Sequence, residues 1–264
     1  MSGRAFSLAR RGRFARPGER WFRPPTSYWR PELYERYFTR TPVGALLRRR
    51  DDEIVHAALD RLLKSANEVL EVGAGTGHYT VPIARRCARV VALDAAPDMV
   101  DYLSERAERE GLANVETGVG RLPDGIDAAG PFDGVVCLGV LGYVENLEAA
   151  LRALAGRLRP GGWALFSMPP RTLEGRVHVG FEIAGRRQVS LRSPQEAVAA
   201  ARAAGLSGAP GARGAHLGWD HSAARGAARH LAAGRAIGSS PVSASSSSSC
   251  GSAAAVRAQE PGAA

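Results

Sequence analysis

Two patterns of apolar residues alternate along the chain. In one, apolar residues recur at helical spacing; in the other, they form short continuous runs, as in a buried strand. Helical spacing predicts helices over 52–64, 78–87, 97–110, 145–158 and 194–204. Short apolar runs between them predict strands at 68–72, 89–93, 114–118, 132–137 and 163–168. This alternation predicts an α/β fold with a doubly wound, mostly parallel sheet.

The two ends of the chain lack this pattern, so we divide the chain into three parts. Residues 1–26 are rich in arginine and are interpreted as a disordered leader, with a transit peptide as the alternative. Residues 27–206 hold the predicted domain. Its aromatic segment 27–47 is expected either to pack on the domain as a helix or to form a lid over a ligand pocket. Residues 207–264 have low complexity and predict a disordered tail.

The net charge of +9 is unevenly distributed along the chain. Residues 1–50 hold 13 arginines against three glutamates, whereas residues 51–206 hold 17 basic and 21 acidic side chains. Because the predicted domain is mildly acidic, we expect no nucleic-acid partner.

No apolar run is long enough to span a membrane. The three cysteines, Cys87, Cys137 and Cys250, are widely spaced and include no CxxC pair. This spacing argues against a disulfide framework and against a zinc site, so we expect no metal and a cytoplasmic location.

The predicted strand at 68–72 runs directly into three glycines at alternate positions, Gly73, Gly75 and Gly77. A dinucleotide fingerprint would need its third glycine at position 78, which is His78. Glycines let the backbone approach a ligand, and free N–H groups at the start of the following helix can bind the ligand's polar groups. We therefore expect a nucleotide-like ligand at the carboxyl end of this strand.

The sequence EVGAGTG at 71–77 resembles motif I of the class I S-adenosylmethionine-dependent methyltransferases. Asp94, FDGVVCLGVLGYVEN at 132–146 and LRPGGWALFSMP at 158–169 resemble further motifs of that family, so the resemblance covers about residues 52–170. It implies a Rossmann-like methyltransferase fold, S-adenosylmethionine as the cofactor, and methyl transfer to a small-molecule acceptor. The cofactor-binding residues that it implies are Glu71, Gly73, Gly75, Gly77, Asp94, Gly120, Arg121, Cys137 and Leu138.

The chain departs from the family pattern in two places. After the third strand the family has an acidic residue that contacts adenine, whereas this chain has Gly120 and Arg121; backbone groups or Asp124 would take its role. The family also ends in a helix and two strands, but no strand is predicted after Leu206. The last strands are therefore expected to be missing or divergent, from divergence or translation out of frame, with the fifth strand left as an open edge.

The sequence assigns no catalytic base. Tyr143 follows the fourth strand, where acceptors bind in the family, or else it caps the sheet. His178 and Glu182 share one side of a strand predicted at 176–183, which faces either a substrate cavity or solvent; a second short strand is predicted at 186–191. His78 either contacts the cofactor or faces solvent. Two alternative functions remain open, a cofactor-binding protein without turnover and an NAD(P)-dependent oxidoreductase, and the sequence does not reveal the oligomeric state.

Overall fold

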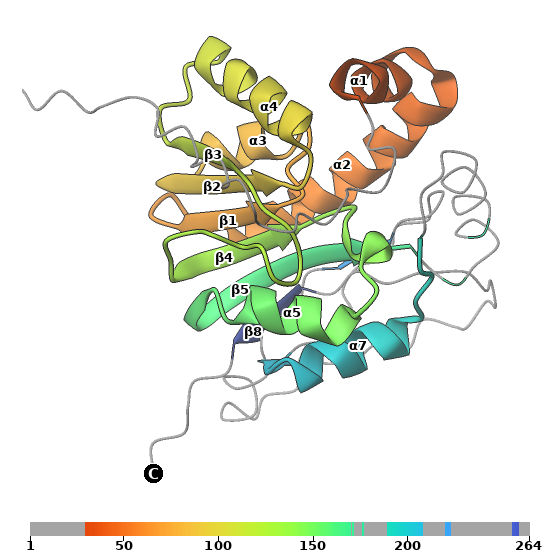
Figure 1. Cartoon of the computed structure of the whole chain (residues 1–264), viewed down its shortest axis with the longest axis vertical. Helices are drawn as coiled ribbons and strands as arrows, with labels where there is room; N and C mark the ends of the chain where they lie inside the picture. Colours follow the sequence, from red (N-terminus) through yellow and green to blue (C-terminus); the bar gives the residue numbers. More distant parts are fainter. Residues whose placement is uncertain are drawn as a thin grey trace, which may run out of the picture.

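The strands form one twisted sheet with helices on both faces (Figure 1) in the computed structural model, which describes residues 30–169, 171, 176, 189–207, 220–222 and 255–258. Five parallel strands lie in the order β3-β2-β1-β4-β5. Their bounds are β1 (Glu68–Val72), β2 (Arg89–Asp94), β3 (Val115–Val119), β4 (Phe132–Cys137) and β5 (Leu158–Met168). The strand order reverses between β1 and β4, as in a doubly wound fold, so the predicted fold class is confirmed.

Both faces of the sheet are covered, which explains why the central strands are apolar throughout. Helices α2 (Pro42–Leu62), α3 (Thr80–Ala84) and α4 (Pro97–Arg109) pack on the face that includes Val69. Helices α5 (Leu147–Ala155) and α7 (Pro194–Ala203) pack on the face that includes Leu70. Glu71 therefore shares the α2 face with Val69, because alternate residues of a strand point to the same side.

The N-terminal part of the domain is more helical than the apolar pattern indicated. Helix α1 (Pro31–Arg40) precedes α2, which starts ten residues before the predicted start at 52. Thr41 caps α2, since its side chain accepts a hydrogen bond from the backbone N–H of Gly44, and Pro42 occupies the first helical position. This start signal lies inside the aromatic segment, where helical spacing alone did not reveal it.

Two other boundaries differ from the prediction. Helix α3 has five residues rather than the expected ten, because turns occupy residues 78–79 before it and 85–86 after it. Strand β5 starts at Leu158, where a helix end was expected, and pairs there with Phe132, while Trp163 pairs with Gly134. Between these two pairs, β5 has four residues and β4 has one. The Pro-Gly-Gly sequence therefore forms an irregularity within the strand and does not end a helix.

The expected open edge at β5 is wrong. Strand β7 (Asp220–Ser222) pairs antiparallel with Phe166–Met168, and β8 (Ala255–Ala258) pairs antiparallel with Trp163–Leu165. Strand β6 (Leu206–Ser207) pairs in turn with β8. The final strands are present but only two to four residues long, which agrees with the divergent alternative. Segments this short leave no readable apolar alternation, so backbone pairing with β5 decides their place.

Several predictions concern residues outside the described part of the chain. The predicted leader, 1–26, lies outside it. The predicted tail, 207–264, also lies outside it, except for Ser207, β7 and β8. The same is true of most of the strands predicted at 176–183 and 186–191. Arg176 is described and has a helical conformation, so the first of those strands does not begin there. Residues 189–191 are described and belong to no strand.

Candidate cofactor-binding site

The loop after β1 needs glycine at three positions for two different reasons. Gly73, Gly75 and Gly77 have φ values of 82°, 54° and 83°. A Cβ atom on Gly73 would lie 1.9 Å from Cγ2 of Val140, and one on Gly77 would lie 2.3 Å from Cδ1 of Leu103. A Cβ on Gly75 would meet no heavy atom within 4 Å, so this residue borders open space. The outer two glycines permit close packing, and the central one leaves its backbone accessible to a ligand.

Asp94 lies beside this accessible glycine at the carboxyl end of β2. Its Oδ2 accepts a hydrogen bond from the backbone N–H of Gly75 at 2.8 Å, and its Oδ1 accepts one from that of Ala96 at 2.9 Å. Burial raises the pKa of Asp94, while these backbone donors act in the opposite direction. The carboxylate is thus held in place against Gly75, at the position where a strand-end acid can accept ribose hydroxyls.

Glu71 is a buried carboxyl at the end of β1, with 3% of its surface exposed. Its Oε2 accepts a hydrogen bond from Oγ1 of Thr80 at 2.6 Å. Burial raises the pKa of Glu71 to about 7; the Thr80 hydrogen bond lowers it, and the nearby charge of Asp94 raises it further. In the described part of the chain no basic side chain forms an ion pair with Glu71. A ligand cation would therefore supply the charge that this group lacks.

The loop after β4 forms the facing wall of the site. Val140 packs against Gly73, and the backbone N–H of Gly139 donates to Oγ of Ser167 at 2.9 Å. Cys137 is fully buried in the core on the α5 side, and burial raises the pKa of its thiol. Leu138 is half-buried, and contacts of Cys137 and Leu138 with the cofactor stay a prediction.

Gly120 and Arg121 lie in a tight turn next to Asp94. The backbone N–H of Gly120 donates to the carbonyl of Asp94 at 2.9 Å, and Gly120 is buried against Leu93. Arg121 is exposed, and its backbone forms two hydrogen bonds with that of Gly125. The turn brings Gly120 to the site, but contacts between these residues and adenine stay a prediction, as does the role of the exposed Asp124.

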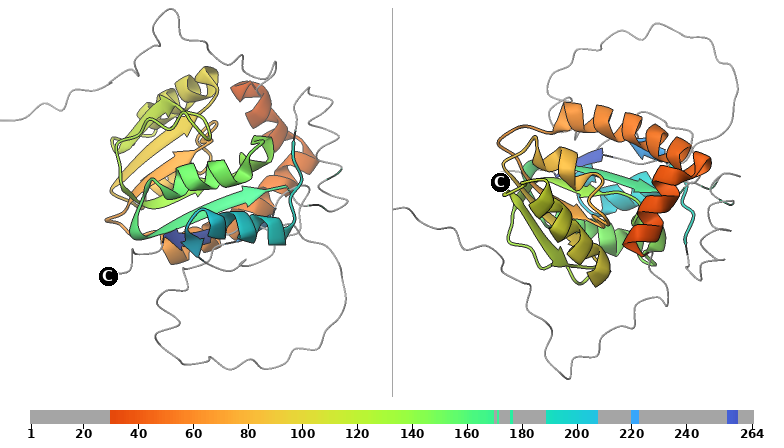
Figure 2. Two further views of the ribbon diagram at one scale, coloured as in Figure 1. Left: turned by 60° about the horizontal axis from the view of Figure 1, so that its bottom comes forward. Right: turned by 90° about the horizontal axis from the view of Figure 1, so that it is seen from above.

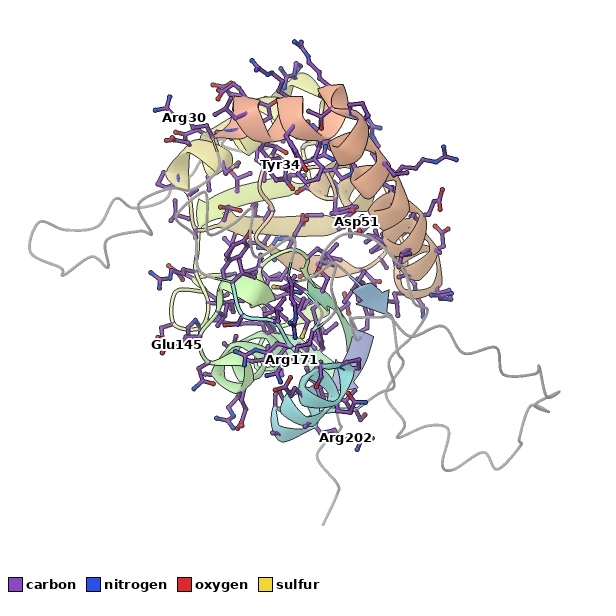
Figure 3. The ribbon with its side chains drawn as sticks, turned by 90° about the vertical axis from the view of Figure 1, so that its right-hand side faces the viewer. Arg30, Tyr34, Asp51, Glu145, Arg171 and Arg202 are labelled. Carbon is purple, nitrogen blue, oxygen red and sulfur yellow. The ribbon has the colours of Figure 1, made fainter. Side chains whose placement is uncertain are left out.

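Helix α1 lies beyond the end of the sheet to which the parallel strands point (Figure 2). Figure 3 views this end, with Tyr34 on the side of α1 that faces the sheet and Asp51 on α2. Thr76 Oγ1 donates a hydrogen bond to Oε1 of Glu35, which joins α1 to the glycine loop. This contact agrees with both alternatives for the aromatic segment, a helix packed on the domain and a lid, and the lid stays a prediction.

Sequence reasoning missed Glu35 and Arg48 as site residues, because no motif marks contacts between residues that lie far apart in the chain. Arg48 Nη1 lies 3.4 Å from Oε2 of Glu35 and 3.2 Å from Nδ1 of His78. The Nε2 atom of His78 lies 2.6 Å from Oδ1 of Asp52. Both ring nitrogens of His78 are thus engaged, so it is neither a solvent-facing histidine nor an available base.

The remaining candidate residues are Tyr143 and His178. Tyr143 ends the short 3-10 helix η1 (Leu141–Tyr143) and is 40% exposed, which fits an acceptor wall and a cap on the sheet equally well. His178 lies outside the described residues. Within the described residues, no group of three or more His, Cys, Asp or Glu side chains is arranged to hold a metal ion, and no helix has the length and apolar character to cross a membrane.

These parts combine into a site for a ligand with hydroxyl groups and a positive charge. The open backbone at Gly75 lies against the carboxylate of Asp94, Glu71 lies at the end of the preceding strand, Val140 packs on Gly73, and α1 contacts the loop at Thr76. S-adenosylmethionine has both features, in its ribose and in its sulfonium and ammonium groups. The residues present therefore fit the cofactor that the motifs implied.

Comparisons with known proteins agree with this geometry. A family model described as "Methyltransferase domain" matches residues 69–162. The chain is 35% identical over 113 residues to the ubiquinone biosynthesis O-methyltransferase of Xanthomonas axonopodis pv. citri, covering 42% of this chain and 47% of that protein. It is 30% identical over 127 residues to the enzyme of that name from Methylocella silvestris, covering 48% of each chain. The chain thus spans about half the length of the curated relatives it matches.

Solved structures of low identity share the fold. The magnesium protoporphyrin IX methyltransferase of Synechocystis PCC 6803, with bound S-adenosylhomocysteine, superposes with a TM-score of 0.54 at 19% identity, covering 69% of this chain and 85% of that one. The N-methyltransferase NodS from Bradyrhizobium japonicum WM9 superposes with a TM-score of 0.52 at 18% identity, covering 68% of this chain and 95% of that one. Residues 69–162 thus match the methyltransferase-domain family, and the strand order and loop geometry agree with the class I S-adenosylmethionine-dependent methyltransferases that the motifs resemble.

Proposed function

We propose that the protein transfers the methyl group of S-adenosylmethionine to a small-molecule acceptor. The observation that carries this proposal is the open backbone at Gly75 held against Asp94 at the point where the strand order reverses. Bound there, the cofactor supplies an activated methyl carbon. Asp94 would hold its ribose, and Glu71 would favour its cationic end.

The protein's remaining task is to align the acceptor and exclude water. Leu138 and Val140 would form the apolar wall of the transfer site, and Tyr143 would border the acceptor. An oxygen acceptor is the first class to test, because the matched relatives are named O-methyltransferases. A general base is required only if that oxygen is a poor nucleophile at neutral pH.

Calorimetry with S-adenosylmethionine, S-adenosylhomocysteine and NAD tests cofactor choice. We expect both sulfur ligands to bind, and Asp94→Asn to weaken them by about 10–100-fold, the usual cost of losing a charged hydrogen-bond partner. Asp101→Asn, an exposed acid on α4, is the matched control and should bind like the unmodified protein. Binding of NAD but of neither sulfur ligand would overturn the proposal.

Labelled-methyl transfer into a metabolite extract tests turnover. We expect a labelled small molecule whose formation is reduced by Asp94→Asn in proportion to cofactor binding. Tight binding of both sulfur ligands without a labelled product from any extract would instead favour a binding protein without turnover.

A further inference from the structure

One carboxylate joins the N-terminal helices to the glycine loop. Glu35, on α1, accepts the hydrogen bond of Thr76 Oγ1, although 41 residues separate the two. Thr76 is 1% exposed and lies between Gly75 and Gly77, so its hydroxyl has no access to water as an alternative partner. The contact therefore holds the loop at its most flexible part.

Arg48 supports the same carboxylate from α2. Its guanidinium lies 3.4 Å from Glu35 and packs over the rings of Tyr34 and Phe38, 5.5 Å and 4.6 Å from their centroids. The side chain of Glu35 is 20% exposed and that of Arg48 is 12% exposed, so the pair is shielded from water. A shielded, charge-assisted contact of this kind is stronger than one on the surface.

Arg48 also holds the other side of the loop, through His78. An arginine can only donate, so Nδ1 of His78 accepts, and its Nε2–H donates to Asp52. The two helices thus hold the side chains on both sides of Gly77. Helix α1 holds Thr76 through Glu35, and α2 holds His78 through Arg48 and Asp52.

We propose that Glu35 is a positioning residue that closes the α1–α2 lid on the glycine loop and slows exchange of the cofactor. This proposal rests on the proposed function, because the loop is the cofactor site. Three glycines at alternate positions, all with positive φ, give the loop many accessible conformations. A contact with another element is needed to hold the loop in a single conformation. Glu35 supplies that contact from the element that covers the site.

Glu35→Ala removes the acceptor, and Glu32→Ala is the matched control, because Glu32 is an exposed acid on the same helix. Thr76→Val removes the donor at nearly constant shape, while Glu35→Gln and Thr76→Ser keep a hydrogen-bonding group. Two readouts are measured: amide hydrogen exchange of α1 and residues 73–77 in the ligand-free protein, and the dissociation rate of S-adenosylhomocysteine.

We expect Glu35→Ala and Thr76→Val each to speed amide exchange in both segments and to raise the dissociation rate by about tenfold. The double variant should be no worse than either single variant, Thr76→Ser should match the unmodified protein, and Glu35→Gln should be intermediate. Unchanged exchange and dissociation in Glu35→Ala, or the same change in Glu32→Ala, would overturn the proposal. If the unmodified protein binds no sulfur ligand, the proposed function fails, and the ligand-free exchange still tests the link to the loop.

Discussion

The three glycines of the cofactor loop are equivalent in the sequence but have different physical roles. Gly73 and Gly77 allow the loop to pack on Val140 and Leu103, and Gly75 leaves room for a ligand. Alternate spacing alone does not separate these roles, since all three residues have positive φ. Substitutions can separate these roles. Backbone strain lowers the free energy of unfolding, whereas a blocked ligand space lowers the affinity for the cofactor.

Gly75→Ala should lower both stability and cofactor affinity. Its φ of 54° costs a side chain about 1 kcal/mol, and the added methyl group would occupy the open space in which we propose that the cofactor binds. Gly111→Ala is the matched control, with a φ of 69°, no heavy atom within 4 Å of its Cβ, and a position at the far end of α4. Urea unfolding should show similar stability losses in both variants, whereas calorimetry should show weaker binding only in Gly75→Ala. Equal affinities would contradict an open ligand space at Gly75.

Glu71 makes the stability of the ligand-free protein depend on pH. Its pKa is about 7 in the folded protein and roughly 4.3 in an unfolded chain. Between these values the unfolded chain loses the proton while the folded protein keeps it, so stability is full below the lower pKa and falls as pH rises to the upper one. Glu71→Gln should remove this loss, which amounts to about 4 kcal/mol.

Urea unfolding of both proteins at pH 5 and pH 8 checks this expectation. The advantage of Glu71→Gln over the unmodified protein should grow from the lower to the higher pH. Glu145→Gln, at an exposed position, is the control and should show a difference that does not depend on pH. An advantage of Glu71→Gln that is equal at both pH values would mean that Glu71 ionises normally.

At the scale of elements, the edge of the sheet depends on segments that are far from β5 in the chain. Strand β8 lies between β5 and β6 and is paired on both sides, with Val256 opposite Ala164. Without it, the middle of β5, Trp163–Leu165, would present unpaired backbone groups, a known cause of edge-to-edge aggregation.

Val256→Pro should therefore destabilise the protein and promote its aggregation, because proline cannot donate a backbone hydrogen bond within a paired strand. The expected loss is about 2–3 kcal/mol in urea unfolding, with larger particles in light scattering after mild heating. Val256→Thr keeps the backbone donor and a β-branched side chain, so it should unfold and scatter like the unmodified protein to within about 1 kcal/mol. If Val256→Pro also behaves like the unmodified protein, β8 does not protect β5.

At the scale of the whole molecule, the cofactor site is assembled from elements that span most of the domain. Helix α1, the loop after β1, the end of β2 and the loop after β4 all meet at the carboxyl end of the sheet. A ligand that contacts all of them is expected to stabilise the domain as one unit, since it binds only the folded state.

S-adenosylhomocysteine at 100 times its dissociation constant should add about 2.7 kcal/mol to the free energy of unfolding. For a domain of this size that corresponds to a rise in Tm of roughly 5–10 °C in scanning calorimetry. NAD at the same concentration should leave Tm unchanged and is the control. An equal rise with NAD would show that the site does not discriminate between the two classes of ligand.

Local pattern was sufficient for the features that depend on neighbours in the chain. The five parallel strands, the glycine loop and the acids at the two strand ends each arise from a short run of residues, so apolar periodicity and spacing predict them. The same is true of α4, where Pro97 begins the helix and Gly111 follows its end.

Only the tertiary structure decided the features that join distant segments. It brought Glu35 to Thr76, placed His78 between Arg48 and Asp52, and paired β7 and β8 with β5. These contacts depend on which faces meet when the chain folds, and no local pattern encodes that. Local patterns therefore established the fold class and the kind of cofactor, and the folded arrangement established which distant residues meet at the glycine loop and how the sheet ends.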